Sequence, residues 1–169
     1  IATATIGTDH IDLDYCRSRG IEVANAPGCN APAVAQYVFA SLAQVINRPI
    51  KEYTIGIVGV GHVGKIVEAW AHQLGMRVLV CDPPRAEVEC TNNFVSLAEI
   101  AEQCDIITFH TPLTKEGKYP THHICNASFL ASLKHRPIVI NCARGAIFDT
   151  QAVIDALDNG VVSNLIVDC

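Results

Sequence analysis

Short apolar runs recur along the chain after residue 50, and segments with helical spacing of apolar residues lie between them. The runs are rich in valine and isoleucine and almost free of charge, which is typical of strands that are buried on both faces. They occupy residues 54–59, 77–81, 105–110, 137–141 and 164–168. This alternation predicts an α/β fold, namely a Rossmann-type doubly wound parallel sheet with helices on both faces.

The segments between the runs also carry helix boundary signals. Residues 62–74 place apolar side chains on one helical face, and Gly75 follows as a C-terminal stop. Residues 96–99 read Ser-Leu-Ala-Glu, a capping box that predicts a helix to about residue 103. Further helices are expected at residues 126–133 and 149–160.

A different helix is predicted before residue 50. Asn30 can cap it, Pro32 suits its first turn, and the segment continues to about Ile46 without a single charge. A helix that lacks a charged face is buried on every side. We therefore interpret residues 31–46 as the contact of a homodimer, with burial inside the same chain as the alternative.

Composition excludes several classes of protein. The 169 residues include 12 basic and 17 acidic ones, for a net charge of −5, and half are hydrophobic. An acidic chain without a basic block does not suit nucleic acid or an anionic membrane surface. No window of 18 residues is uniformly apolar, so no membrane span is expected.

The eight cysteines include no C-x-x-C pair, which argues against a zinc ribbon or a thioredoxin-type site. With no signal peptide, we expect a reduced, cytoplasmic protein. The chain starts without methionine and stops directly after an apolar run, so we expect it to be a fragment of a longer protein. No metal site is predicted, and the seven histidines are read as ordinary surface or core residues.

The first strand runs into a G-x-G-x-x-G sequence made by Gly59, Gly61 and Gly64. In the dinucleotide fingerprint the first glycine permits a tight turn, the second lets backbone approach a pyrophosphate, and the third lets helix pack on strand. The main-chain N–H groups of His62 and Val63, at the helix N-terminus, would bind phosphate. A glycine turn without a ligand is the alternative, and the strand, the helix and the acid that ends the next strand argue against it.

That acid is Asp82, 18 residues after Gly64. A carboxylate at this position accepts hydrogen bonds from the adenosine ribose and repels a 2′-phosphate, which favours NAD over NADP. Arg85 is the one nearby feature that could support NADP.

Three other residues follow strand ends, where ligands of open α/β sheets bind. Arg144, beside a glycine, could hold a substrate carboxylate bidentately, or it could be a surface arginine. Thr111 could line the cofactor cleft or be a turn residue before proline. Asp168 could face the nicotinamide or be an ordinary loop acid.

Four motifs spread over nearly the whole chain resemble the D-isomer-specific 2-hydroxyacid dehydrogenases. They are residues 25–30, the three glycines with Asp82, residues 110–113 and residues 142–145. The stretches 3–12, 26–31, 81–86 and 108–119 are more similar to one member, which oxidises 4-phospho-D-erythronate at C2 in vitamin B6 synthesis.

The resemblance implies a role for each matching residue. Arg144 would be catalytic, holding the substrate carboxylate and polarising the developing carbonyl, and Thr5 would touch substrate. Thr111, Asp168 and the segment Cys142, Ala143 and Arg144 would line the NAD site together with Asp82 and the glycine segment.

The resemblance also implies a division of the chain. Residues 1–24 would be the remnant of a substrate domain with its hinge, and residues 25–169 the NAD-binding domain, truncated before the family's catalytic glutamate and histidine. The chain alone is therefore expected to bind NAD and to turn nothing over.

Two alternatives stay open. Phosphoglycerate or glyoxylate/hydroxypyruvate dehydrogenases belong to the same class, and the insertion-like residues 115–121 argue mildly against them. A corepressor-like protein that senses NAD without catalysis is the other alternative.

Overall fold

The computed structural model describes residues 1–8, 10–91 and 93–168. Asp9, within the motif at 3–12, and Cys169, the eighth cysteine, lie outside the described residues, as does Asn92.

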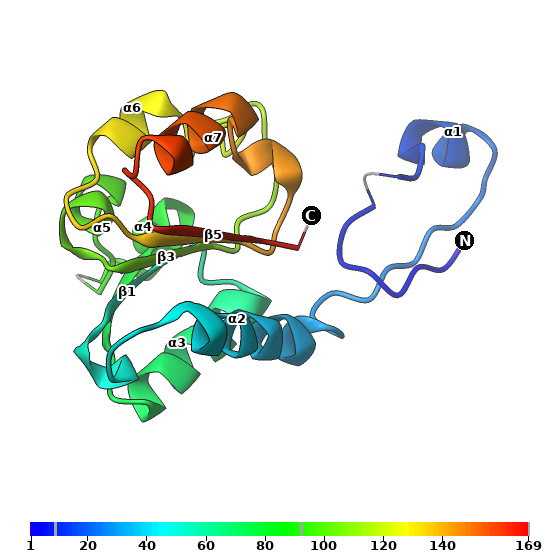
Figure 1. Cartoon of the computed structure of the whole chain (residues 1–169). Coiled ribbons are helices and arrows are strands. Elements are labelled where there is room, and N and C mark those ends of the chain that lie inside the picture. The colour runs from blue at the N-terminus through cyan, green and yellow to red at the C-terminus, as the bar shows by residue number, and fades with distance from the viewer. Residues whose placement is uncertain (9, 92, 169) are drawn as a thin grey trace.

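Five parallel strands form one sheet in the order β2-β1-β3-β4-β5 (Figure 1). Their bounds are β1 Thr54–Val58, β2 Arg77–Cys81, β3 Ile106–Phe109, β4 Ile138–Asn141 and β5 Asn164–Val167. Every residue of β3 and β4 is buried, as expected for uncharged strands in the middle of a covered parallel sheet. The predicted parallel sheet is confirmed, with four of the five strands one or two residues shorter than the apolar runs.

Helices cover both faces of this sheet, as predicted (Figure 1). On one face, α2 (Ala31–Val45) and α3 (His62–Gln73) pack over a core of aliphatic side chains that includes Ile55 and Ile57. On the other face lie α5 (Leu97–Gln103), α6 (Ala127–Ala131) and α7 (Thr150–Asp158). The core on that side is built around Phe109, whose ring meets Phe129 and Phe148 edge-on.

The sequence analysis did not predict two of the helices, the short helix at Leu13–Ser18 and α4. α4 (Pro83–Glu89) begins directly after β2, where two consecutive prolines suggest a loop. Proline is nevertheless well suited to a first helical turn, and the Asp82 side chain caps the helix by accepting from the Arg85 N–H at 3.2 Å. The acid that ends β2 thus also starts α4.

The burial of α2 bears on the expected dimer contact, which stays a prediction. Its side chains Ala31, Ala35, Val38 and Leu42 are buried within the same chain, against α3 and the sheet. The opposite side of the helix is exposed, so the helix is not covered on every side. Its lack of charge therefore does not by itself require a subunit contact.

Residues 1–24 extend away from the sheet and carry the short helix α1 (Leu13–Ser18) (Figure 1). A bridge between Ala2 and Ala24 closes this extension on itself. Asn25 then donates its side-chain N–H to the Ile6 carbonyl at 2.8 Å, at the point where the chain turns toward α2. This arrangement fits the division at residue 24, which stays a prediction.

Candidate functional site

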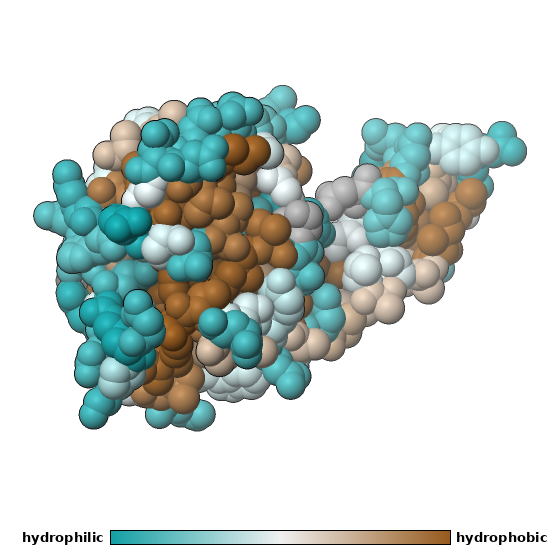
Figure 2. All heavy atoms as spheres, viewed as in Figure 1, coloured by the Kyte–Doolittle hydropathy of each residue, from teal (hydrophilic) through white to brown (hydrophobic). Residues whose placement is uncertain are grey.

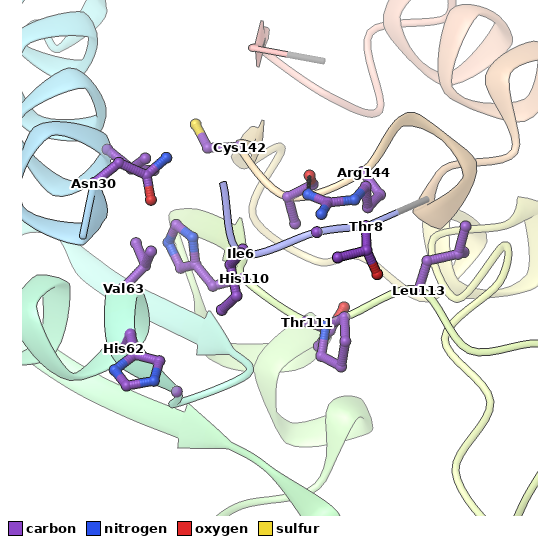
Figure 3. A pocket seen from close by; sticks show the side chains of 15 residues that line it. Ile6, Thr8, Asn30, His62, Val63, His110, Thr111, Leu113, Cys142 and Arg144 are labelled. Atoms are coloured by element: carbon purple, nitrogen blue, oxygen red, sulfur yellow. Dashed lines mark hydrogen bonds between the residues drawn. The ribbon is translucent and has the colours of Figure 1, made fainter. Parts of the chain in front are cut away.

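A cavity of about 410 Å³ opens at the carboxyl ends of the strands (Figure 3). Three loops contribute to it: residues 61–63 after β1, residues 110–113 after β3 and residues 142–144 after β4. The strand order changes direction between β1 and β3, because β2 lies on one side of β1 and β3 to β5 follow on the other. Open α/β sheets bind ligands in the crevice at such switch points. The fold therefore places three separate sequence motifs around one site.

The glycine loop fits a phosphate group. A Cβ at Gly64 would lie 2.1 Å from the Gly59 carbonyl oxygen, so helix α3 approaches the loop more closely than any side chain allows. Gly59 has φ of +90°, and a Cβ there would lie 2.8 Å from the Thr111 backbone nitrogen. A Cβ added to Gly61 would meet no other atom within 4 Å. The N-terminus of α3 is therefore open on the side of the cavity.

Asp82 fixes this loop. Its Oδ2 accepts from the Val60 N–H at 2.8 Å, while Oδ1 accepts from the Arg85 N–H. Each carboxylate oxygen has a second lone pair for a further donor. Asp82 does not line the cavity itself, and it lies at the neighbouring strand end, where the adenosine ribose binds in the dinucleotide fingerprint.

Two shielded polar atoms belong to residues that line the cavity. His110 Nδ1 and Thr111 Oγ1 are shielded from solvent and have no hydrogen-bond partner among the described residues. The other ring nitrogen of His110, Nε2, lies 2.9 Å from the buried Thr108 hydroxyl, which fixes the ring. Since shielded polar atoms are normally satisfied, these two are suited to a polar ligand. The sequence analysis had read His110 as an ordinary histidine.

Burial lowers the pKa of His110 to about 4, and this gives a testable pH dependence. The unfolded chain takes up this proton near pH 6.5, whereas the folded chain takes it up only near pH 4. Stability from this group is therefore complete above pH 6.5 and is lost as the pH falls toward 4. Between pH 7 and 4, the free energy of unfolding should fall by up to about 3 kcal/mol more in the wild type than in His110→Asn. Urea denaturation across this range measures the difference, and identical pH profiles would contradict it.

The loop after β4 is held by Asn141, to which the sequence analysis assigned no role. This buried side chain donates to the Arg144 carbonyl at 2.9 Å and accepts from the Ala143 N–H at 3.0 Å. The Arg144 guanidinium donates to the Ala143 carbonyl at 2.7 Å, and Arg144 lines the cavity (Figure 3). The loop thus presents a cation to the same space as the glycine loop.

The structure brings together most of the predicted site residues. Gly61, His62, Val63, Thr111, Cys142, Ala143 and Arg144 line the one cavity. Thr5 does not, because it is exposed and its hydroxyl donates to the Gly7 carbonyl at 2.8 Å. Asp168 is also exposed and does not line the cavity; its N–H donates to the Asn141 carbonyl. Instead the N-terminal segment contributes Ile6, Gly7 and Thr8, which lie in the motif at 3–12 but were not named as site residues.

Within residues 1–8, 10–91 and 93–168, no three histidine, cysteine or acidic side chains gather as metal ligands would. None of the helices in the described ranges is long and apolar enough to cross a membrane.

Comparison with known proteins places this geometry in context. Residues 33–169 match the family described as D-isomer specific 2-hydroxyacid dehydrogenase, NAD binding domain. The chain is 53% identical to an erythronate-4-phosphate dehydrogenase of Bacteroides thetaiotaomicron, over 99% of the chain and 49% of that enzyme. It is 51% identical to the enzyme of the same name from Porphyromonas gingivalis, over 100% of the chain and 47% of that enzyme. The chain thus spans about half the length of the curated relatives that it matches.

Solved structures give the same result. A D-lactate dehydrogenase from Aquifex aeolicus, complexed with NAD and lactic acid, superimposes with a TM-score of 0.84 at 31% identity, over 99% of this chain and 56% of that one. An NAD⁺-bound 3-phosphoglycerate dehydrogenase from Entamoeba histolytica gives 0.82 at 31% identity, over 99% of this chain and 55% of that one. The nucleotide-binding fold inferred from the strands and glycines is confirmed.

Proposed function

The chain belongs to the D-isomer specific 2-hydroxyacid dehydrogenase family and contains its NAD binding domain, and on that premise we propose that it serves the oxidation of 4-phospho-D-erythronate at C2. One observation carries the reaction class: the glycine loop and Arg144 line the same cavity. The substrate follows from the names of the relatives that are about half identical to the chain.

Residues 59–64 would hold the cofactor by its diphosphate, through main-chain N–H groups at the N-terminus of α3. Asp82 would accept from the ribose hydroxyls while it keeps the loop in place through Val60. Thr111 and the loop from Cys142 to Arg144 would line the remainder of the site. NAD, when bound, supplies the hydride acceptor.

Arg144 would perform the work on the substrate. A guanidinium binds a carboxylate through two parallel hydrogen bonds, which orients C2 toward the cofactor. The same positive charge stabilises the partial negative charge on the oxygen as the hydroxyl becomes a carbonyl. Thr5, through the resemblance, and Thr8, through its place in the cavity, would lie on the substrate side.

A proton acceptor is also required, and His110 is poorly suited to the task. With its pKa lowered to about 4 by burial, it is a weak base at neutral pH. The resemblance assigns proton transfer to a histidine and a glutamate beyond Asp168, which lies near the end of residues 1–169. By the same resemblance we propose that residues 1–24 belong to a substrate domain and that residues 25–169 bind NAD.

Substrate preference tests this proposal. The enzyme that contains this chain should reduce NAD with 4-phospho-D-erythronate at a higher kcat/KM than with 3-phosphoglycerate or with glycolate and glycerate, the alcohols matching glyoxylate and hydroxypyruvate. A higher kcat/KM for 3-phosphoglycerate would show that 4-phospho-D-erythronate is not the preferred substrate. Tight NAD binding without turnover of any of these acids would favour a sensor.

We further propose that the protein is a homodimer through the exposed side of α2. That side carries small or uncharged residues, namely Ala33, Gln36, Ala40, Ala43 and Gln44. Figure 2 shows apolar side chains gathered over β5 as well, on the face of the molecule that also includes α2. Sedimentation at micromolar concentration should show a dimer, and Ala40→Glu should shift it to monomer by placing an unpaired charge in the contact. A strict wild-type monomer would contradict this interface.

We also propose a cytoplasmic location, because of the state of the cysteines. The seven cysteines in the described ranges are all free thiols. Unpaired thiols suit a reducing compartment.

A further inference from the structure

Arg85 is the cation three residues after the acid that ends β2, and its guanidinium makes three kinds of contact. Its NH1 group donates to the Val60 carbonyl at 2.7 Å, inside the glycine loop. Its Nε and NH2 groups meet the Glu89 carboxylate at 2.7 and 2.6 Å. The guanidinium also lies over the Phe94 ring, 5.1 Å from its centroid.

The pair formed by Arg85 and Glu89 is partly exposed. The two side chains keep 29% and 39% of their surface accessible. An exposed pair one helical turn apart contributes little to the stability of the fold. The Arg85 guanidinium nevertheless lies at the glycine loop, where it bonds the Val60 carbonyl while Asp82 accepts from the N–H of the same residue, and there it affects whatever binds to the ribose end of the site.

A second cation near this end is engaged in the same way. Lys118 forms an ion pair with Glu87 of α4, and Tyr119 donates its hydroxyl to the same carboxylate at 2.8 Å. α4 thus carries two glutamates, each paired with a basic side chain. Neither positive charge is left uncompensated for a phosphate.

We propose that Glu89 is a cofactor-selectivity residue that excludes NADP by occupying Arg85. This inference rests on the proposed NAD site and deepens it. A 2′-phosphate beside Asp82 would meet two carboxylates, and the one nearby guanidinium is committed to Glu89 and the Val60 carbonyl. Asp82 alone repels the phosphate, and Glu89 removes the cation that would offset this repulsion.

The test compares Glu89→Gln with the wild type. The glutamine keeps the shape and helix propensity of residue 89 and removes its charge, so Arg85 becomes available to an anion. Fluorescence or calorimetric titrations with NAD, NADP, 5′-AMP and 2′-AMP give four dissociation constants for each protein. In Glu89→Gln, the affinity for NADP and for 2′-AMP should rise about tenfold, whereas NAD and 5′-AMP should change by less than about twofold.

Two further proteins separate the causes. Glu102→Gln removes an equal charge from an exposed position on α5 and should leave all four constants unchanged. Arg85→Ala combined with Glu89→Gln should lose the gain for NADP, because the gain depends on the freed guanidinium.

Each outcome decides a separate claim. If the wild type fails to bind NAD, the proposed function is wrong. If NAD binds and Glu89→Gln leaves the ratio of NADP to NAD affinity unchanged, the selectivity role of Glu89 is wrong. A gain that persists without Arg85 would show a simple loss of repulsion and would also overturn the proposal.

Discussion

Substituting Gly64 with alanine should abolish NAD binding and destabilise the domain. The added methyl group would lie 2.1 Å from the Gly59 carbonyl oxygen, which is a backbone atom and cannot rotate away. Helix α3 would have to move off β1, taking the phosphate-binding N–H groups with it. Overpacking of this kind costs about 3 kcal/mol, and the displaced loop should weaken NAD by more than about 100-fold.

Urea denaturation and NAD titration measure the two effects on Gly64→Ala. Gly61→Ala is the matched control, because no atom lies within 4 Å of its built Cβ. That variant should unfold within about 1 kcal/mol of the wild type. It should still weaken NAD, since the methyl group occupies the space for the diphosphate. A Gly64→Ala protein with normal stability and normal NAD affinity would disprove the close packing of loop and helix.

Substituting Arg144 should remove catalysis while leaving NAD binding largely intact. In the enzyme that contains this chain, Arg144→Gln should lower kcat/KM for the hydroxy acid by about 10²- to 10³-fold, because a preorganised donor to the developing carbonyl is lost. Arg144→Lys should recover only part of this, since an ammonium cannot bind a carboxylate through two parallel bonds.

Steady-state kinetics with both substrates checks this expectation. Arg17→Gln, at an exposed arginine of α1 paired with Asp14, serves as the control and should behave as the wild type. If Arg144→Gln raised only the KM for NAD and left kcat unchanged, the arginine would belong to the cofactor site and not to the substrate.

Much of the fold could be predicted because the signals are local. Uncharged runs such as 105–110 become central strands, and glycines such as Gly64 allow close backbone contacts that no other residue permits. No helix was predicted at α4, which is short and whose start depends on two prolines in the first turn and on the cap from Asp82. A lack of charge does not show which side of a helix its own chain covers, so the exposed side of α2 could be identified only from the fold.

The site was less predictable because its parts meet only in three dimensions. Thr8 lies in the motif at 3–12, but only the fold shows that it, and not Thr5, lines the cavity. Asn141 and His110 look like ordinary strand-end residues in sequence, and their roles depend on partners that the fold brings near. Arg85 is ambiguous in sequence, and its bonds to Glu89 and the Val60 carbonyl become visible only in the fold.

Competing titrations of NAD and NADP into the wild type and Asp82→Ala test the central claim most directly. The account predicts that the wild type prefers NAD. It also predicts that Asp82→Ala loses most of that preference, since the ribose acceptor and the bond to the Val60 N–H are both removed. Wild-type protein that binds NADP as tightly as NAD, or an Asp82→Ala protein with unchanged NAD affinity, would contradict it.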